Sequence, residues 1–168
     1  MSFTETSAKE LDGFNTFSQI GEKWMLITAG NKEKFNTMTA SWGMMGILWT
    51  KDVATAFVRP QRYTFEFLEK NDYYTLSFFE SKYKKQLSYC GRNSGRNVDK
   101  IKETGLTPIF DEQAPYFKEA GTVFICKKIY GQFISPEGFI DVDLDKNYEN
   151  KDYHKMYVGE IIKCLEEK

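Results

Sequence analysis

The sequence predicts a mainly β protein, built as an antiparallel sheet or barrel with short helices packed outside it. Three observations indicate this fold class. Runs rich in aromatic and β-branched residues recur along the chain, and aromatic residues alone make up 16% of it. Glycine and asparagine turns separate many of these runs. The regular alternation of strands and helices that a doubly wound fold needs is missing.

Length, charge and hydropathy exclude several other classes of protein. A chain of 168 residues with 41% hydrophobic and 28% charged residues fits one globular domain over residues 1–168. A net charge of −1 argues against a strongly basic nucleic-acid binder. No apolar run approaches the roughly 18 residues of a membrane span, and the start lacks a secretory signal. We therefore expect a cytoplasmic protein without a membrane partner, with residues 1–22 loosely held.

Runs of apolar, β-branched and aromatic residues predict the strands. In chain order these runs are Trp24–Thr28, Val53–Val58, Tyr73–Phe79, Thr122–Ser135 and Tyr153–Ile162. The first run ends at the turn signal Gly30-Asn31, and Pro60 follows the second. We expect a break at Gly131 and a solvated end over residues 166–168.

Three short helices are predicted in the middle of the chain. The first covers Thr64–Lys70 with Thr64 as its N-cap, and the second covers Lys82–Tyr89. Ser94 can cap a third helix, which Gly105 closes.

Several kinds of reaction chemistry are excluded by what the sequence lacks. His154 is the only histidine, and the three cysteines, Cys90, Cys126 and Cys164, are widely spaced, so no zinc site is expected. The cysteines read as free, buried thiols in a reducing compartment. Neither of the two glycine-rich nucleotide-binding motifs, G-x-G-x-x-G and G-x-x-x-x-G-K-[ST], is present.

A Thr- and Ser-rich strand over residues 36–43 is the first segment with functional potential. Alternation places its side chains on two faces, with Thr37, Thr39 and Ser41 opposite Met38, Ala40 and Trp42. Small hydroxylated side chains let a planar ligand approach the backbone and receive hydrogen bonds at its edge. The alternative is an edge strand whose threonines face water, and pattern alone favours it.

The second segment is Val58–Thr64, where Arg59 and Arg62 flank Pro60 and precede a helix start. Unpaired N–H groups and a positive helix end, together with arginines and Thr64, suit a phosphate dianion. A solvated turn with flexible arginines explains the pattern equally well.

The third segment, Cys90–Lys100, again combines glycines, cations and the capping Ser94 at a helix start. Arg96 and Lys100 are four residues apart, which would place them on one helix face. A flexible polar loop with an ordinary helix cap is the alternative.

Two lesser features stay open at this point. Lys82–Lys85 could contact nucleic acid by charge and stacking, although a solvated helix face is the simpler interpretation. His154 lies close to a strand, where a lone histidine is more often structural.

Taken in order, these segments resemble the flavin reductase-like family of FMN-binding split barrels, most closely its flavoredoxin-like members. The resemblance is carried by Asn36–Trp42 with Trp49, Val58–Thr64, Ser94–Lys100 with Gly105–Pro108, and His154 with Gly159–Ile161. It covers the chain from about Trp24 to Ile162. Asp52 stands where a proline is common and Asn97 where an aspartate is common, which weakens the placement in a subfamily.

The resemblance implies a split β-barrel, a homodimer, and FMN near the subunit interface. Thr39, Ala40, Ser41 and Trp42 would line the isoalloxazine ring. Arg59, Arg62 and Thr64 would hold the phosphate, joined by Ser94, Arg96 and Lys100. His154 would contact an incoming nicotinamide dinucleotide.

The function implied is an NADH- or NADPH-dependent flavin reductase, which passes a hydride to N5 of FMN and on to an unidentified redox protein or free flavin. The cofactor supplies the chemistry, so one histidine suffices and no catalytic triad is needed. A flavoredoxin-type electron carrier with little nicotinamide oxidation is the alternative. A nucleic-acid-binding β domain, acting through Lys82–Lys85, is a distant third.

Overall fold

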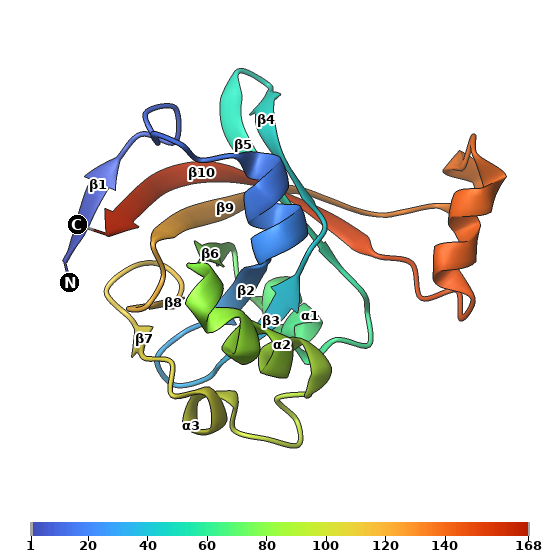
Figure 1. Ribbon diagram of the computed structural model, residues 1–168. Helices are drawn as coiled ribbons and strands as arrows, with labels where there is room; N and C mark the ends of the chain where they lie inside the picture. The colour runs from blue at the N-terminus through green and yellow to red at the C-terminus, as the bar shows by residue number, and fades with distance from the viewer. Residues whose placement is uncertain (1, 168) are drawn as a thin grey trace.

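The computed structural model describes residues 2–167 and confirms the mainly β fold (Figure 1). Within these residues an eight-stranded antiparallel sheet forms the body of the protein. Seven strands follow one path: β3 (Phe35–Ala40), β2 (Met25–Gly30), β6 (Tyr73–Phe78), β9 (Thr122–Phe133), β10 (Lys155–Glu167), β5 (Lys51–Val58) and β4 (Gly43–Leu48). The eighth, β1 (Phe3–Thr6), pairs with β10. A short ribbon of β7 (Pro108–Ile109) and β8 (Tyr116–Phe117) lies apart from this sheet.

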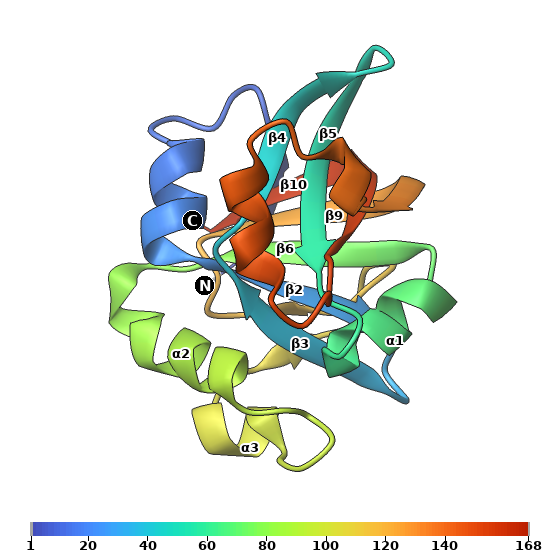
Figure 2. The same cartoon turned by 90° about the vertical axis from the view of Figure 1, so that its right-hand side faces the viewer.

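The two strands at the ends of this path, β3 and β4, are neighbours in the chain. Only Ser41 and Trp42 join them, yet β3 pairs with β2 and β4 pairs with β5. Three peptide steps reach about 11 Å at most, so the sheet must curl until its two edges come close. The sheet is therefore an open barrel, and we call the place where its edges approach at residues 41–42 the seam. Figure 2 shows β4 and β5 crossing in front of the longer strands, with β3 below them.

The bend of the sheet is concentrated in its longest strands. The pairing of β9 with β10 shifts register at Val158/Gly159 and again between Ile161 and Lys163. Such bulges increase the local twist and bend a strand, which lets a sheet close on itself. The predicted break at Gly131 is wrong, because β9 continues through Gly131 and pairs it with Tyr157.

Both faces of the sheet are covered, so the inner strands read as continuous apolar runs. Along β2, Met25 and Ile27 belong to the cluster inside the barrel, and Leu26 belongs to the cluster under the helices. All six residues of β2 are buried. Many of the chain's aromatic side chains fill these two clusters, among them Tyr74, Phe78 and Phe124 inside and Phe117 outside.

The helices lie on the outside, as predicted: α1 (Tyr63–Lys70), α2 (Lys84–Arg92) and α3 (Lys100–Thr104). Further helical segments are the π-helix η1 (Ser18–Lys23) and the 3-10 helices η2 (Ser81–Tyr83), η3 (Pro136–Gly138) and η4 (Val142–Tyr148). Gly105, with φ +70°, ends α3 in the left-handed conformation that the sequence predicted.

The predicted helix caps are wrong at both functional segments. Thr64 lies inside α1, and its buried hydroxyl accepts a hydrogen bond of 2.7 Å from the Asn36 side-chain amide. The third helix begins at Lys100, where the Asp99 carboxylate caps it by accepting from the backbone N–H groups of residues 101 and 102. Ser94 instead accepts from the backbone N–H of Arg96 in the preceding turn. Arg96 therefore does not share a helix face with Lys100.

Both ends of the described chain are held by the sheet. β1 pairs with residues 164–167 of β10, so the solvated end expected from residue 166 onward is instead, as far as residue 167, part of a strand. Phe14 packs edge-on against Phe78 and Phe124, and Ile20 is buried. Much of the N-terminal segment that we expected to be loosely held therefore contributes to the core.

Between β9 and β10 the chain leaves the barrel as an arm, which we define as residues 134–154. The arm carries η3 and η4 and stands away from the sheet (orange in Figure 1). Its apolar side chains Ile140, Val142 and Leu144 are exposed. Arg59 at the end of β5 ties the returning part of the arm to the barrel through the Asp152 carboxylate and the Asn147 carbonyl.

Candidate functional site

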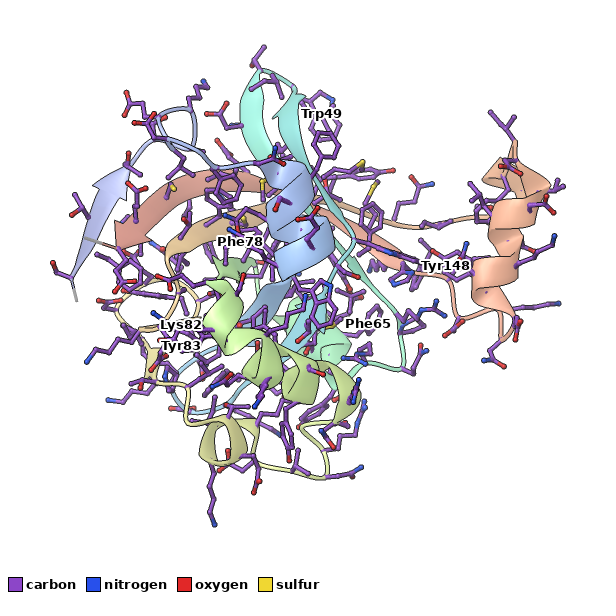
Figure 3. The ribbon with its side chains drawn as sticks, in the orientation of Figure 1. Trp49, Phe65, Phe78, Lys82, Tyr83 and Tyr148 are labelled. Carbon is purple, nitrogen blue, oxygen red and sulfur yellow. The ribbon has the colours of Figure 1, made fainter. Side chains whose placement is uncertain are left out.

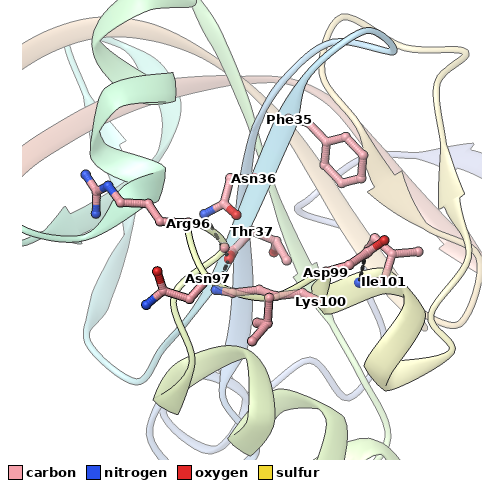
Figure 4. Close-up of a pocket in the computed structure, with 10 residues that line it drawn as sticks. Phe35, Asn36, Thr37, Arg96, Asn97, Asp99, Lys100 and Ile101 are labelled. Atoms are coloured by element: carbon pink, nitrogen blue, oxygen red, sulfur yellow. Dashed lines mark hydrogen bonds between the residues drawn. The ribbon is translucent and has the colours of Figure 1, made fainter.

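Two hollows lie along β3. The first, which we call the seam hollow, has a volume of about 230 Å³ and is lined by Met38, Thr39, Ala40, Ser41, Trp42, Phe57, Arg59, Arg62 and His154. The second, the loop hollow, has a volume of about 460 Å³ and lies between residues 35–37 of β3 and residues 95–101 (Figure 4). Each hollow thus combines one part of β3 with cationic side chains from distant segments.

The structure brings most of the predicted site residues together. Those that line the seam hollow are Thr39, Ala40, Ser41, Trp42, Arg59, Arg62 and His154. Arg96 and Lys100 line the loop hollow. Thr64 and Ser94 line neither hollow: Thr64 is a buried residue of α1 bonded to Asn36, and Ser94 bonds within its own turn.

The hydroxyl groups of β3 are used inside the protein. The Thr37 hydroxyl is buried, 2.9 Å from that of Thr28 on β2. The Thr39 hydroxyl donates to the Leu87 carbonyl and so joins β3 to α2. α2 can approach this closely because residue 91 is glycine; a Cβ there would lie 3.3 Å from the Thr39 Cβ. The interpretation of a hydroxylated face open to a ligand is therefore wrong for Thr37 and Thr39, and the seam itself offers backbone groups instead.

Two cations, the buried Lys100 and the half-buried Arg62, meet at the C-terminal end of α2. Arg62 donates a hydrogen bond of 2.9 Å to the Gly91 carbonyl, and the Lys100 ammonium donates to the Cys90 carbonyl at 2.8 Å. Lys100 also donates to the Thr37 carbonyl at 2.7 Å and is only 6% exposed (Figure 4). The last carbonyls of a helix lack intrahelical partners and carry partial negative charge, which favours cations there.

These two cations are desolvated without a neutralising carboxylate. Burial lowers the pKa of Lys100 to about 8; the nearby Cys90 thiol raises it, and the positive charge of Arg62 lowers it again. Burial also lowers the pKa of Arg62. In the described part of the chain, neither residue forms an ion pair with Asp or Glu. A bound anion would remove this imbalance of charge.

Arg59 and Arg96, in contrast, are already paired. The Arg59 guanidinium lies 2.6 Å from the Asp152 carboxylate and holds the pKa of that carboxyl below its ordinary value. Arg96 pairs with Glu66 of α1, and its guanidinium lies 4.7 Å from the centre of the Tyr63 ring. Each of these arginines holds a surface segment in place, so a ligand anion would have to compete with a carboxylate for it.

His154 closes one side of the seam hollow. Its ring centre lies 5.1 Å from that of Trp42, and its Nδ1 lies 2.9 Å from the Tyr148 hydroxyl. Burial, with a further contribution from Arg59, lowers the pKa of His154 to about 4, while Asp152 acts in the opposite direction. The imidazole is therefore neutral at neutral pH.

Sequence reasoning missed three residues of this region. Met38 and Phe57 line the seam hollow, and Tyr148 contacts His154 from the arm. The alternation along β5 carried a signal for Phe57, because buried Ala56 and Val58 flank it and point to the other face. No local pattern marked Tyr148, which reaches His154 only because the arm folds back.

The described residues also bear on metal binding, on membrane spanning and on the basic segment Lys82–Lys85. In residues 2–167, no group of three or more His, Cys, Asp or Glu side chains could hold a metal ion, and no helix is long and apolar enough to cross a membrane. The predicted basic patch is partly engaged within the protein, since Lys82 pairs with Glu80 at 2.9 Å and Lys84 lies over the Trp24 ring.

The comparison with known protein families decides the family. A family model described as the flavin reductase like domain matches residues 17–168. The chain belongs to this family. None of the curated proteins searched gave a match.

Solved structures of this flavin reductase-like family share the fold. A flavoredoxin from Methanosarcina acetivorans is 24% identical with a TM-score of 0.67, covering 87% of this chain and 69% of its own. A Shewanella frigidimarina protein described as having a split barrel domain is 17% identical with a TM-score of 0.69, covering 96% and 79%. An NADH:FAD oxidoreductase from Streptomyces globisporus, solved with NAD and FAD fragments, is 16% identical with a TM-score of 0.64, covering 86% and 74%. The predicted split barrel is thus confirmed.

The buried ammonium of Lys100 predicts a pH-dependent stability. Folded Lys100 loses its proton near pH 8, whereas a lysine in the unfolded chain does so near pH 10.4, so the unfolded state binds more protons between these values. Burial of the charged group therefore costs stability below pH 8, and this cost disappears as the pH rises towards 10. Urea denaturation should show the free energy of unfolding of the wild type rising relative to that of Lys100→Met across this interval.

The matched control is Lys102→Met, which removes an exposed lysine from the same helix. Its difference from the wild type should not change with pH. A difference between wild type and Lys100→Met that is constant from pH 7 to 10 would contradict the buried, desolvated state of Lys100.

Proposed function

We propose that the seam hollow binds FMN and that the protein is an FMN-dependent oxidoreductase using NADH or NADPH. The observation that carries this proposal is the pair Arg62 and Lys100, two desolvated cations beside each other without a carboxylate partner. A phosphate dianion matches such a pair in charge and in hydrogen-bonding capacity. Membership of the flavin reductase-like family supports the choice of a flavin mononucleotide.

Arg62 lines the seam hollow, and the other residues that line it fit the flat part of this cofactor. Ala40 is small, and Trp42 and Phe57 provide apolar aromatic surface. Ser41 and Trp42 lie outside both strand pairs, so their backbone N–H and C=O groups are available at the seam. We propose that residues 39–42 line the isoalloxazine ring, with Arg62 and Lys100 at the phosphate. Arg59 and Arg96 would join by exchanging their carboxylate partners, whereas Thr64 and Ser94 act by shaping the surrounding segments.

When bound, FMN supplies the redox chemistry by accepting a hydride at N5 and passing on one or two electrons. The chain then has three tasks: to hold the anion, to leave one face of the ring accessible, and to present His154 to a nicotinamide. No general base is required, in keeping with the neutral state of the single histidine. The final acceptor would be a redox protein or free flavin in a reducing, cytoplasmic setting, which suits the three buried free cysteines.

The proposed binding of the FMN phosphate by Arg62 and Lys100 is tested by comparing FMN with riboflavin, which lacks the charged group. Arg62→Gln should weaken FMN binding by about tenfold or more, because a charge-assisted hydrogen bond contributes roughly 1.5–3 kcal/mol, while riboflavin binding changes little. Titration monitored by flavin fluorescence gives both constants. Arg92→Gln is the control: it removes an exposed cation of α2 that lines neither hollow. Equal losses for both ligands would show that Arg62 acts through folding, and no uptake of FMN by the wild type would overturn the function.

A flavoredoxin-type electron carrier is the second candidate, favoured by the likeness to the Methanosarcina acetivorans flavoredoxin. Anaerobic mixing of the FMN-loaded protein with NADH or NADPH separates the two. Bleaching of the flavin absorption band within seconds indicates the reductase, which we expect. A flavin that stays oxidised with either nicotinamide, but is reduced by dithionite, indicates the carrier.

We further propose that a second copy of the chain covers β4 and the arm. β4 is an edge strand whose exposed side chains include Met44, Ile47 and Leu48, and the exposed Trp49 follows directly after it. Apolar edges of this kind invite pairing with another chain unless they are covered. Light scattering should give a mass near twice 19.6 kDa for the wild type and a lower mass for Ile47→Lys. A wild-type monomer at micromolar concentration would refute the dimer and leave the phosphate test above unaffected.

A further inference from the structure

Tyr148, at the end of η4, brings the arm into contact with the site. Its side chain is almost fully buried, and its hydroxyl oxygen lies 2.9 Å from Nδ1 of His154. Figure 3 shows Tyr148 where the arm returns towards the barrel. His154 lines the seam hollow, so this contact connects the hollow to a segment that the sequence analysis did not include in the site.

In the hydrogen bond between the Tyr148 hydroxyl and His154 Nδ1, the hydroxyl is the favoured donor. A phenol is a much stronger acid than the N–H of a neutral imidazole, and an imidazole nitrogen is a better acceptor than a phenol oxygen. In this arrangement Tyr148 donates, Nδ1 accepts, and the ring proton is on Nε2.

Tyr148 is held firmly enough to impose this choice. The Arg59 guanidinium lies 5.0 Å from its ring centre, and the same group bonds the Asn147 carbonyl at 2.9 Å and Asp152 at 2.6 Å. On the arm itself the Tyr153 ring lies 4.8 Å from that of Tyr148. These contacts hold the phenol from the barrel side and from the arm side.

The surroundings of His154 keep its ring neutral, so that it carries a single N–H. The charged groups near it are Arg59, from the end of β5, and Asp152, from the arm, and these two are paired with each other. Tyr148 is the titratable group in direct contact with the ring, and Trp42, whose ring centre lies 5.1 Å from that of His154, is uncharged. No described residue hydrogen-bonds Nε2, and Nε2 is not among the buried unpaired atoms, so it is the ring atom open to a ligand.

We propose that Tyr148 is a positioning residue that fixes His154 in the tautomer protonated at Nε2, so that the imidazole presents an N–H donor to an acceptor atom of the ligand in the seam hollow. That acceptor would be a carbonyl oxygen or ring nitrogen of the flavin, or the carboxamide oxygen of the nicotinamide. The identity of the ligand rests on the proposed function, whereas the tautomer does not. The arm thereby becomes part of the site.

Nitrogen-15 NMR of histidine-labelled protein, prepared without flavin, tests the tautomer directly. His154 is the only histidine of the chain, so each ring nitrogen gives one signal without further assignment. At neutral pH the wild type should show a protonated Nε2 and an unprotonated Nδ1. In Tyr148→Phe, which keeps the ring and its packing, the signals should shift towards a mixture that includes protonated Nδ1.

Tyr153→Phe is the matched control, because it removes a hydroxyl from the same arm that bonds Asp145 rather than His154. It should leave both nitrogen signals as in the wild type. A wild type protonated at Nδ1, or a Tyr148→Phe spectrum identical to that of the wild type, would overturn the proposal. If Tyr153→Phe changed the signals as much as Tyr148→Phe, the effect would belong to the folding of the arm, and the role of the Tyr148 hydroxyl would also be refuted.

A second measurement connects the tautomer to ligand binding. In the FMN-loaded protein, Tyr148→Phe should raise KM for the nicotinamide or Kd for FMN by about three- to tenfold, the range for one neutral hydrogen bond. Unchanged constants, together with the expected NMR shift, would refute the role towards the ligand. Absence of FMN uptake by the wild type, with the expected NMR result, would instead refute the proposed function alone.

Discussion

The organisation of this protein depends on a two-residue connection between strands at opposite ends of one sheet. β3 pairs with β2 and β4 pairs with β5 rather than with each other, yet Ser41 and Trp42 keep the two strands within a few peptide lengths. The sheet must close round its core to satisfy this connection. Ser41 and Trp42 therefore lie outside both strand pairs, and they line the hollow where the candidate ligand would lie.

The seam determines which distant residues can meet. β5 ends beside it, so the segment that follows carries Arg59 and Arg62 to the hollow, and β10 starts beside it, which brings His154. α2 packs on β3 and turns its last carbonyls towards the same place, where Arg62 and Lys100 bind consecutive carbonyls. Helix carbonyls compensate a buried cation only in part, since a favourable helix terminus contributes at most about 2 kcal/mol and burial of an ion costs several. The uncompensated remainder is what an anionic ligand can use.

Much of the fold could be predicted from local patterns, because strands buried on both faces leave continuous apolar runs. The same patterns fail where the deciding contact is distant in the chain. Thr64 has the residue type of a helix cap, but it lies inside α1, and its hydroxyl accepts a hydrogen bond from Asn36 of β3. Ser94 and Asp99 are both good capping residues, and in the structure Asp99 caps the helix, which begins at Lys100. Thr37 resembles a ligand-facing hydroxyl, yet its partner is Thr28 across the sheet.

The candidate site was predictable to a similar extent and for similar reasons. Residue types that suit an anion and a flat ring were visible in sequence, and most of them do meet at the seam. What the sequence did not show is how each cation is compensated: Arg59 and Arg96 are paired with Asp152 and Glu66, while Arg62 and Lys100 are not. This difference separates arginines that hold the structure together from cations that remain available to a ligand.

A neutral His154 is consistent with this separation between paired arginines and cations without a carboxylate partner. A charged imidazole close to Arg59 would add another cation to a region that already holds two uncompensated ones, and burial opposes that charge. Tyr148 engages one ring nitrogen, so the other can act as a donor of defined direction without carrying charge. In the proposed function, Arg62 and Lys100 would attract the anion, while His154 would orient the ligand. An arrangement of this kind suits a protein whose ligand brings its own reactivity, because the protein needs to bind and orient rather than to exchange protons.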